Sequence, residues 1–296
     1  MPADLALLVD PGRGRAAVAA VRLVQRLRAR GARVRVLAGR SGADSARLAL
    51  RAAAERPDAL VAVGGDGLVH QALQGVVGTG VALAIVPAGT GNDIARALGC
   101  PAGRPDRTAA ALLAGRTRPV DAVRLTLADG TERHYLSVLA CGFDARVNER
   151  VNGFRFSAGR ADYLRGLVAE LGSFAAADYS LDVDGTRIDE PGLLVAVGNT
   201  AAYGGGIPMC PGAIPDDGLL DVVLLRAAPL AHYLPLLPRI LTGHHTTDAT
   251  VVALRGRRVA IRAGAGAAYA DGERMGPGPL VCEAVPKSVE VLDTTS

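Results

Sequence analysis

Residues 60–67 read LVAVGGDG, an apolar run that ends in a glycine-rich turn around Asp66. Such a run is typical of a buried strand, and the apolar spacing over residues 69–77 predicts a helix after the turn. Alternating strands and helices predict a mostly parallel sheet with helices on its faces. The other elements expected in this part of the chain are strands at 5–9, 34–36 and 81–86 and helices at 16–30, 44–55 and 92–98.

Beyond residue 120 the sequence changes character. Short segments rich in β-branched residues are separated by turn signals such as Asp129-Gly130 and Asp184-Gly185. A helix is expected at 160–171, and another at 230–241 that Pro235 and Pro238 make irregular. The sequence therefore predicts an α/β domain over 1–120 and a mostly antiparallel β-sandwich over 121–283. The strands expected in the second domain are 123–127, 135–139, 179–183, 193–197, 220–225, 251–254, 259–262 and 289–292.

Composition excludes several classes of binding site. The 296 residues include 33 basic and 29 acidic ones, a mild bias that is far from the concentrated positive charge of nucleic-acid binders, so no nucleic-acid partner is expected. Aromatic residues make up 3% of the chain and tryptophan is absent, which argues against base-stacking platforms. Lys287 is the only lysine, so the Walker-type and protein-kinase sites, which place a lysine beside the phosphates, are excluded.

The location expected from the sequence is the cytoplasm. The first ten residues carry no basic leader, and no stretch approaches the roughly 18 consecutive apolar residues that a membrane span needs. Cys100, Cys141, Cys210 and Cys282 have no paired spacing and are interpreted as small core residues. His244-His245 lacks a third metal ligand nearby, so a solvated loop is expected there.

Three glycine-rich turns follow expected strands in the first domain. They are residues 10–14 (DPGRG), 64–67 (GGDG) and 87–93 (PAGTGND). In a parallel sheet, ligands bind at the carboxyl ends of strands, where glycine lets backbone amides approach an anion and a helix start adds its dipole. Each turn alone is more simply interpreted as a tight connector, but three together favour one anion-binding crevice.

Polar residues in these turns have more than one interpretation. Asp66 needs a partner in a poorly solvated turn, which a magnesium ion or a helix start would supply; as a plain cap it would serve the helix near Val69. Thr90 and Asn92 offer short hydrogen-bonding groups to a nucleotide. The alternative for both is simple helix capping, which for Asn92 is an equal alternative to ligand contact.

Five motifs in order carry a resemblance to a known family. Besides the second and third turns, they are Cys141-Gly142-Phe143-Asp144, the run from Tyr203-Gly204-Gly205-Gly206 through residues 211–221, and Asp271-Gly272-Glu273. Their order and spacing resemble the diacylglycerol kinase catalytic-domain family, which includes bacterial lipid kinases and sphingosine kinases, over nearly the whole chain. NAD kinases are similar at residues 64–67, but the third turn and residues 216–219 resemble the lipid kinases more closely.

The resemblance implies a three-layer α/β domain and a β-sandwich domain with an ATP cleft between them, and residues 284–296 returning to the first domain. By this analogy the ATP-contacting residues include Arg15 near the phosphates, whereas Arg13 is equally well a solvated loop charge. The full set implied is Asp10, Pro11, Gly12, Arg13, Gly14, Arg15, Gly64, Gly65, Gly67, Gln71, Gly89, Thr90, Asn92, Asp93 and Asp271, with Asp66 near the metal.

The catalytic base and a structural metal site are also implied by the resemblance. A hydroxyl acceptor needs a base, and the resemblance makes Glu273 that base, with Asp271 as a supporting ligand or orienter. Without the resemblance, Glu273 would be read as an exposed hairpin-turn residue. A structural Mg²⁺ is carried over to Asp217 with the backbone carbonyls of Ile214 and Leu219; the alternative is a plain Asp-Gly turn.

The chain departs from the family near the phosphates. Leu68 stands where the family commonly has threonine, His70-Gln71 stand in place of an Asn-Glu pair, and Asp10 replaces the usual asparagine. Losing one such hydrogen bond weakens nucleotide binding by roughly 1 kcal/mol, so slower turnover is expected.

The function expected is that of an ATP-dependent lipid kinase that uses Mg²⁺ and phosphorylates diacylglycerol or a related lipid alcohol. Two alternatives stay open: a catalytically degenerate nucleotide- or lipid-binding regulator, which Leu68 and Gln71 motivate, and an NAD kinase-like enzyme. The expected partner is a lipid substrate at the membrane surface, with peripheral contact on its inner face, and a homodimer is left open.

Overall fold

The computed structural model describes residues 3–10, 12, 14–100, 103, 105–142, 176–263 and 266–294. The chain divides into two compact units. Unit 1 comprises Met1–Ala122 and Pro286–Ser296, and unit 2 comprises Val123–Val285. Two strands, β5 (Thr117–Thr126) and β15 (Leu280–Leu292), carry the chain across the boundary between the units. The helix expected at 160–171 lies outside the described residues.

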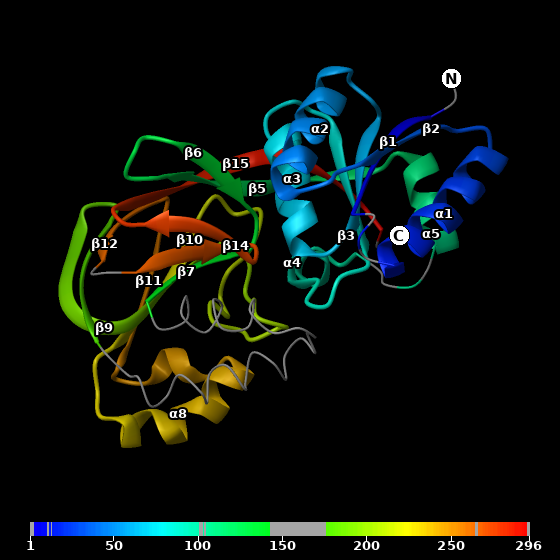
Figure 1. Ribbon diagram of the computed structural model, residues 1–296. Helices are drawn as coiled ribbons and strands as arrows, with labels where there is room; N and C mark the ends of the chain where they lie inside the picture. Colours follow the sequence, from blue (N-terminus) through cyan, green and yellow to red (C-terminus); the bar gives the residue numbers. More distant parts are fainter. Residues whose placement is uncertain are drawn as a thin grey trace. The chain divides into compact units, whose positions relative to one another are not determined.

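Unit 1 is built on a parallel sheet in the order β4-β3-β1-β2. Its strands and helices alternate along the chain, as the sequence predicts (Figure 1). The elements are β1 (Asp4–Val9), α1 (Gly14–Ala29), β2 (Arg33–Ala38), α2 (Gly42–Ala54), β3 (Ala59–Gly64), α3 (Asp66–Val76), β4 (Ala82–Pro87), α4 (Asp93–Ala97) and α5 (Pro105–Ala114).

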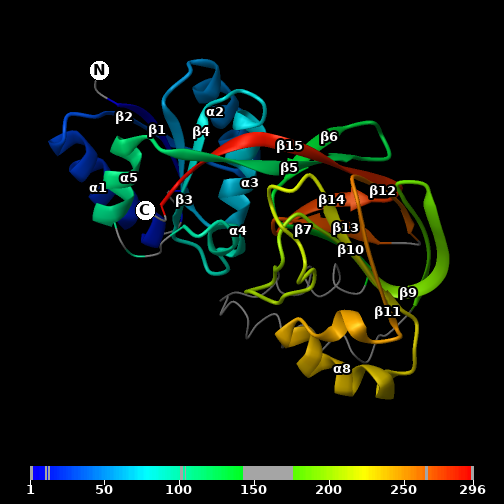
Figure 2. The ribbon, with the colours of Figure 1, turned by 180° about the vertical axis from the view of Figure 1, so that it is seen from behind.

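Helices cover both faces of this sheet because its strands bury side chains on both sides. One face presents alternate residues such as Leu7 and Val61 to α1 and α5, where Leu23 and Leu112 are buried against it. The opposite face is covered by α2 and α3, as the two ribbon views show (Figures 1 and 2). The chain changes direction after β1: α1 leads outward to β2, and α2 returns across β1 to β3. The crevice between β1 and β3 is therefore a topological switch point.

The C-terminal segment completes unit 1. Val291 of β15 pairs in parallel with Leu83 of β4, and Val289, Val291 and Leu292 are buried. Backbone N–H groups anchor the segment on side chains: Lys287 N–H donates to the buried Asp121 carboxylate (2.7 Å). Ala122 N–H donates to Ser288 Oγ (3.1 Å).

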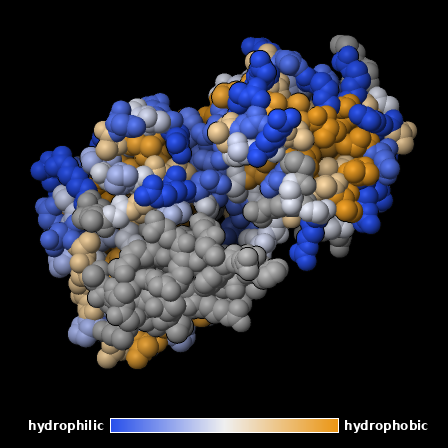
Figure 3. Space-filling model, in the orientation of Figure 1, coloured by the Kyte–Doolittle hydropathy of each residue, from blue (hydrophilic) through white to orange (hydrophobic). Residues whose placement is uncertain are grey.

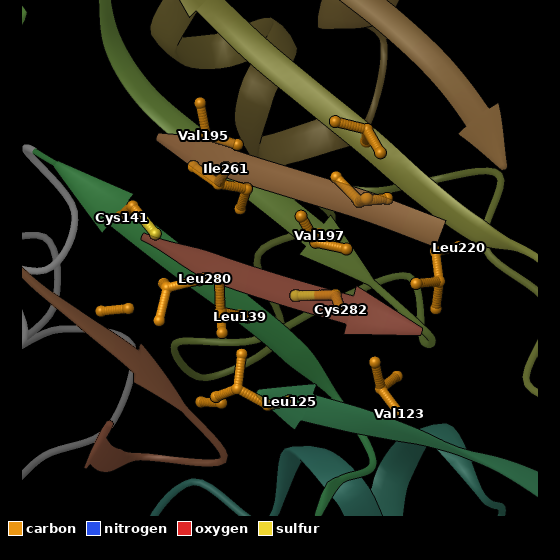
Figure 4. Close-up of a cluster of buried hydrophobic side chains, with 14 of the residues drawn as sticks. Val123, Leu125, Leu139, Cys141, Val195, Val197, Leu220, Ile261, Leu280 and Cys282 are labelled. Carbon is orange, nitrogen blue, oxygen red and sulfur yellow. The ribbon is translucent and has the colours of Figure 1, made fainter. Parts of the chain in front are cut away.

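Unit 2 is a mostly antiparallel sandwich. Its interior is lined by alternate residues of many strands, and Figure 4 shows side chains such as Leu139, Val197 and Cys282 pointing toward one another. The strands are β6 (Glu132–Tyr135), β7 (Val138–Gly142), β8 (Ala177–Val183), β9 (Thr186–Gly198), β10 (Leu220–Arg226), β11 (Val251–Gly256), β12 (Arg258–Ala263), β13 (Ala267–Ala270) and β14 (Glu273–Pro277), with the adjoining ends of β5 and β15.

The outer face of strands β7, β9 and β10 forms a second core. Helix α8 (Leu230–Thr242) buries Tyr233 and Leu236 there, although Pro235 and Pro238 lie inside the helix. A short 3₁₀ helix follows, and His245 in it is buried, with Nε2 hydrogen-bonded to the carbonyl of Met209 (3.0 Å). The expectation of a solvated His244-His245 loop is therefore wrong for His245.

The expected strand at 135–139 is interrupted. β6 ends at Tyr135 and β7 begins at Val138, because the backbone N–H groups of Leu136 and Ser137 donate to the Asp271 carboxylate instead of to a neighbouring strand. This hydrogen bonding spans more than 130 residues of sequence, so no local pattern reports it.

Hydrophobic side chains are exposed on unit 1. Val18 and Val21 of α1 and Val36 of β2 are about half exposed, and Figure 3 shows apolar surface where α1 and β2 lie in Figure 1. Among the residues that the structure describes, none of the helices combines the length and the hydropathy needed to span a bilayer.

Candidate active site

The three glycine-rich turns lie at one edge of the unit 1 sheet. β1, β3 and β4 are parallel, with Val9 opposite Val63 and Gly64 opposite Pro87, so each strand ends at the same edge. The turns that follow contain ten of the predicted ATP-contacting residues that the structure describes: Asp10, Gly12, Gly14, Gly64, Gly65, Gly67, Gly89, Thr90, Asn92 and Asp93. Pro11 and Arg13 lie outside the described residues.

The first turn is shaped by Asp10. Its Oδ1 accepts the Gly12 N–H (2.9 Å), a local turn that an aspartate forms with its own backbone. Helix α1 begins at Gly14, with the exposed Arg15 in its first turn. The acid that stands in place of the family's asparagine thus has a structural partner in the Gly12 N–H.

The second and third turns pack against each other through glycines. A Cβ added at Gly89 would lie 2.4 Å from Gly65 Cα, a distance that real side chains do not adopt. Asn92, in the left-handed region at φ 53°, holds Gly89 in place: Gly89 N–H donates to Asn92 Oδ1 (2.9 Å), and Asn92 Nδ2 donates to Gly89 O (2.8 Å). The Asn92 side chain therefore stabilises the third turn through two hydrogen bonds and does not cap helix α4.

Asp66 joins the same two turns. Helix α3 begins at Asp66 without a side-chain cap, whereas Asp66 Oδ1 accepts the Ile94 N–H of α4 (3.0 Å). Asp66 thus serves the start of a helix other than its own, and a helix start is one of the partners that the sequence analysis expected for it. A Cβ at Gly91 would lie 2.9 Å from Asp66 Oδ2 and 3.5 Å from Asp93 Oδ2, so two carboxylate oxygens flank Gly91.

Arg96 balances part of this negative charge. It forms an ion pair with Asp93 and donates to Gly91 O (2.9 Å). Sequence reasoning missed Arg96, although its spacing of three residues from Asp93 on a helix is a usable signal.

Thr90 and Gln71 are placed at the same edge. Thr90 is exposed at the tip of the third turn. A Cβ at Gly42, the first residue of α2, would lie 3.4 Å from Gln71 Nε2, so the Gln71 amide faces the start of that helix. Leu68 packs over Gly64, since a Cβ at Gly64 would lie 2.7 Å from Leu68 Cδ2. An apolar group therefore covers the strand end where the family has a hydroxyl.

These residues fit a polyphosphate. The starts of α1 and α3 face the switch point, and the backbone at Gly65, Gly89 and Gly91 carries no side chain that would block an approaching anion. Arg15, the second residue of α1, is an exposed cation at the start of that helix. The charge of the site is mixed, because Asp10, Asp66 and Asp93 lie in the same turns, an arrangement that suits an anion accompanied by a divalent cation.

In unit 2, Asp271 and Glu273 lie in a tight hairpin turn between β13 and β14. Asp271 and Gly272 both have positive φ, at 53° and 81°, and Glu273 pairs with Ala270 across the turn. Asp271 is 3% exposed, and its carboxylate accepts N–H groups from Leu136 (3.1 Å) and Ser137 (2.9 Å) and the Ser137 hydroxyl (2.6 Å). Glu273, by contrast, is partly exposed.

The predicted magnesium ligands have other contacts. Asp217 Oδ1 accepts the Leu219 N–H (3.0 Å), and Asp217 Oδ2 forms an ion pair with Arg255. Arg255 also reaches Asp221 (3.0 Å), whose pKa burial raises, and the hydrogen bond to Asp217 raises the pKa of Arg255. Ile214 is about half exposed. The Arg255 guanidinium thus neutralises the charge of Asp217, and the magnesium site stays a prediction. Sequence reasoning did not identify Arg255.

Buried thiols add no nucleophile. Burial raises the pKa of Cys100 to about 11 and that of Cys282 to about 12, so neither forms a thiolate at neutral pH. All four cysteines are buried, which confirms their interpretation as core residues.

Comparison with known proteins agrees with this architecture. Residues 4–125 match the diacylglycerol kinase catalytic domain, and residues 137–293 match the YegS C-terminal NAD kinase beta sandwich-like domain. A diacylglycerol kinase of Mycobacterium tuberculosis is 37% identical over 282 residues, which cover 95% of this chain and 91% of the relative. The chain belongs to the diacylglycerol kinase family.

More distant members of the diacylglycerol kinase family extend the match. The diacylglycerol kinase of Bacillus subtilis is 26% identical over 222 residues, covering 74% of this chain and 71% of the relative. A crystal structure of a diacylglycerol kinase from Bacillus anthracis strain Sterne has a TM-score of 0.79 at 21% identity, covering 98% of this chain and 96% of that one. The expected family and the expected fold class, an α/β domain and a β-sandwich domain, are thereby confirmed.

Proposed function

We propose that this protein is an ATP-dependent lipid kinase that transfers the γ-phosphoryl group of ATP to the hydroxyl of diacylglycerol or a related lipid alcohol. The observation that carries the proposal is the convergence of three amide-rich turns at the carboxyl edge of the unit 1 sheet. Family membership supports it, because the relative from Mycobacterium tuberculosis is a diacylglycerol kinase.

In this proposal, unit 1 binds the triphosphate. Backbone amides at the starts of α1 and α3 and in the third turn donate to phosphate oxygens, and Arg15 adds positive charge. Asn92, Gly89 and Gly65 fix the positions of the amides. Asp66 and Asp93 supply the carboxylates that would hold a divalent cation with the nucleotide, and such a cation would neutralise charge on the transferring phosphoryl group.

Unit 2 supplies the base. The Glu273 carboxylate takes the proton of the acceptor hydroxyl while the hydroxyl oxygen bonds to the γ-phosphorus. The bond from that phosphorus to the bridging oxygen of ADP breaks, and ADP leaves. Positioning and charge stabilisation account for most of the rate in reactions of this class. A lipid acceptor also requires contact with a membrane surface, and we propose peripheral contact for that step.

The test is phosphoryl transfer from radiolabelled ATP by the purified protein. Diacylglycerol in mixed micelles is one acceptor, and NAD is the acceptor that would reveal an NAD kinase-like enzyme. Glu273→Gln should lower kcat on diacylglycerol by about 10²-fold or more, because it removes the base. Glu132→Gln is the matched control, since Glu132 is an exposed glutamate of the same unit, and it should leave kcat unchanged.

Two outcomes would contradict the proposal. Phosphorylation of NAD and not of lipid would assign the other substrate class. Binding of ATP without transfer to any acceptor would favour the regulator, the alternative that the apolar Leu68 beside Gly64 motivates.

A further inference from the structure

Unit 2 contains two hairpins with the same Asp-Gly turn. Asp184-Gly185 joins β8 to β9 with φ values of 49° and 90°, and Asp271-Gly272 joins β13 to β14 with φ values of 53° and 81°. Two consecutive positive φ values define the turn type that asparagine, aspartate and glycine favour in two-residue hairpins. The two turns are thus matched in sequence and in backbone conformation.

Both aspartates also hold a neighbouring segment in the same way. Asp184 accepts the N–H groups of two consecutive residues, Arg257 (2.8 Å) and Arg258 (2.9 Å). Asp271 likewise accepts the N–H groups of Leu136 (3.1 Å) and Ser137 (2.9 Å). The carboxylate in each case ties a hairpin to the adjacent chain.

The Asp271 turn differs in two respects. The hydrogen bonds of Asp184 lie at the surface, whereas Asp271 is almost completely buried. In addition, the Ser137 hydroxyl donates to Asp271 Oδ1 (2.6 Å), and no hydroxyl contact of Asp184 is found among the described residues. The turn itself does not require this burial, because Asp184 makes the same turn in contact with solvent.

Ser137 extends the contact into a buried network. Its carbonyl accepts the Asn199 N–H (2.9 Å), and Asn199 Nδ2 donates to the Leu136 carbonyl (3.0 Å). The junction of β6 and β7, the end of β9 and the turn before β14 are thereby joined. Each of these hydrogen bonds pairs buried polar groups, so breaking one would leave a buried group unpaired at a cost in free energy.

We propose that Ser137, acting through Asp271, is a positioning residue for Glu273, an inference that rests on the proposed role of Glu273 as the base. Glu273 is two residues after Asp271 and pairs with Ala270 across the turn, so the direction of its backbone is set by the turn that Ser137 and Asp271 fix. The matched Asp184-Gly185 turn is followed by Thr186, whereas the Asp271-Gly272 turn is followed by Glu273.

The test is a double-mutant cycle on the full-length protein. Ser137→Ala should lower kcat for phosphorylation of diacylglycerol by at least tenfold, while the KM for ATP stays within twofold. In the Glu273→Gln background the same substitution should change kcat by less than twofold, because the base through which Ser137 acts is gone. Ser137→Thr, which keeps a hydroxyl, should retain most of kcat.

Asp184→Asn is the matched control. It weakens the equivalent turn, so it should lower the thermal midpoint of unfolding while leaving kcat unchanged. Should Ser137→Ala fold poorly, Ser137→Cys keeps the volume with a weak donor and should show the same dependence on Glu273.

The outcomes separate the two proposals. Two outcomes overturn the inference and leave the proposed function standing. In the first, Ser137→Ala lowers kcat by the same factor in the wild type and in the Glu273→Gln background. In the second, Ser137→Ala is as active as the wild type while Glu273→Gln is inactive. A loss of kcat in Asp184→Asn that matches the loss in Ser137→Ala also overturns it. A Glu273→Gln enzyme with full activity overturns the proposed function and the inference with it.

Discussion

At the residue scale, Gly89 and Gly65 approach each other too closely to carry side chains. Gly89→Ala would bring a methyl group to 2.4 Å from Gly65 Cα, so the second and third turns must separate. We expect the KM for ATP to rise about tenfold or more, because amides displaced by an ångström no longer reach the same phosphate oxygens. ATP titration with the purified variant measures this.

Gly130→Ala is the control for that substitution. A Cβ at Gly130 meets no atom within 4 Å, and its positive φ of 82° strains alanine, but Gly130 lies in unit 2 outside the predicted ATP-contacting residues, so the KM for ATP should stay at the wild-type value. A Gly89→Ala enzyme with the ATP affinity of the wild type would contradict the role given to the contact between the two turns.

Leu68 offers a second prediction for the phosphate-binding edge. Leu68→Thr places a hydroxyl where the side chain now covers Gly64, and one added hydrogen bond contributes roughly 1 kcal/mol, about fivefold in affinity. We expect a lower KM for ATP in steady-state assays. Leu68→Ala removes the apolar group without adding a donor and should not show the gain, and equal effects of the two substitutions would refute the hydrogen-bond explanation.

Sequence reasoning was most successful for residues within one motif. It brought Asp66, Gly89 and Asn92 to one edge, because strand ends in a parallel sheet coincide. It did not foresee that Asp66 binds the N–H of Ile94, that Arg255 pairs with Asp217, or that Ser137 binds Asp271. Those contacts join residues 28 to 134 positions apart, and a side chain's distant partner leaves no periodic signal.

At the scale of the element, helix α8 is held by Asp248. The carboxylate accepts hydrogen bonds from Thr250 N–H (3.0 Å) and from Arg239 of the helix (2.9 Å). Chiefly because of the Thr250 N–H, the pKa of Asp248 is lowered from its ordinary 3.8. A depressed pKa means that this stabilisation is present above pH 3.8 and is lost as the pH falls below it.

Asp248→Asn should therefore lower the thermal midpoint at pH 7 and bring the wild type and the variant together in acid. Unfolding measured from pH 7 to pH 2 tests the expectation, with hydrogen exchange of α8 as the local readout. Asp129→Asn, in a surface turn that binds Thr131 N–H in the same way, is the control that leaves α8 unaffected. A difference between wild type and Asp248→Asn that persists unchanged at pH 2 would contradict the assignment.

Elements with strong periodicity were predicted and those decided by tertiary contacts were not. The strands and helices of unit 1 follow from apolar spacing, whereas α5 was missed because its alanine-rich sequence carries a weak amphipathic pattern. The prolines of α8 suggested irregularity, yet the helix continues through both, with Tyr233 and Leu236 buried against the sheet. Packing overrides local propensity in such cases.

At the scale of the whole molecule, unit 1 depends on the chain's last segment. Removing residues 286–296 deletes the buried Val289, Val291 and Leu292, each of which contributes about 1.5–3 kcal/mol. Their sum is comparable with the total stability of a domain, about 5–15 kcal/mol. We expect the truncated chain to lose hydrogen-exchange protection in β1, β3 and β4, while β8 and β9 of unit 2 keep theirs.

A truncation after residue 294 is the control, since it leaves every described residue of the segment in place. If the chain that lacks residues 286–296 lost hydrogen-exchange protection equally in both units, the units would not unfold separately. The overall fold class was predictable because it depends on patterns that extend over long stretches of sequence. Strands and helices alternate in the first part of the chain, and short strands follow in the second. A wrong prediction for one element does not change either pattern.

Lys287 lies exposed between Pro286 and Ser288, with its backbone in the left-handed region at φ 52°, where β15 passes from unit 2 into unit 1. Because it is the only lysine of the chain, its ε-amine is the single side-chain target for amine-reactive dyes and crosslinkers, and its peptide bond is the single site for a lysine-specific protease. A fluorophore carried on a lysine side chain can thus sit only at this position, without engineering a cysteine into the protein.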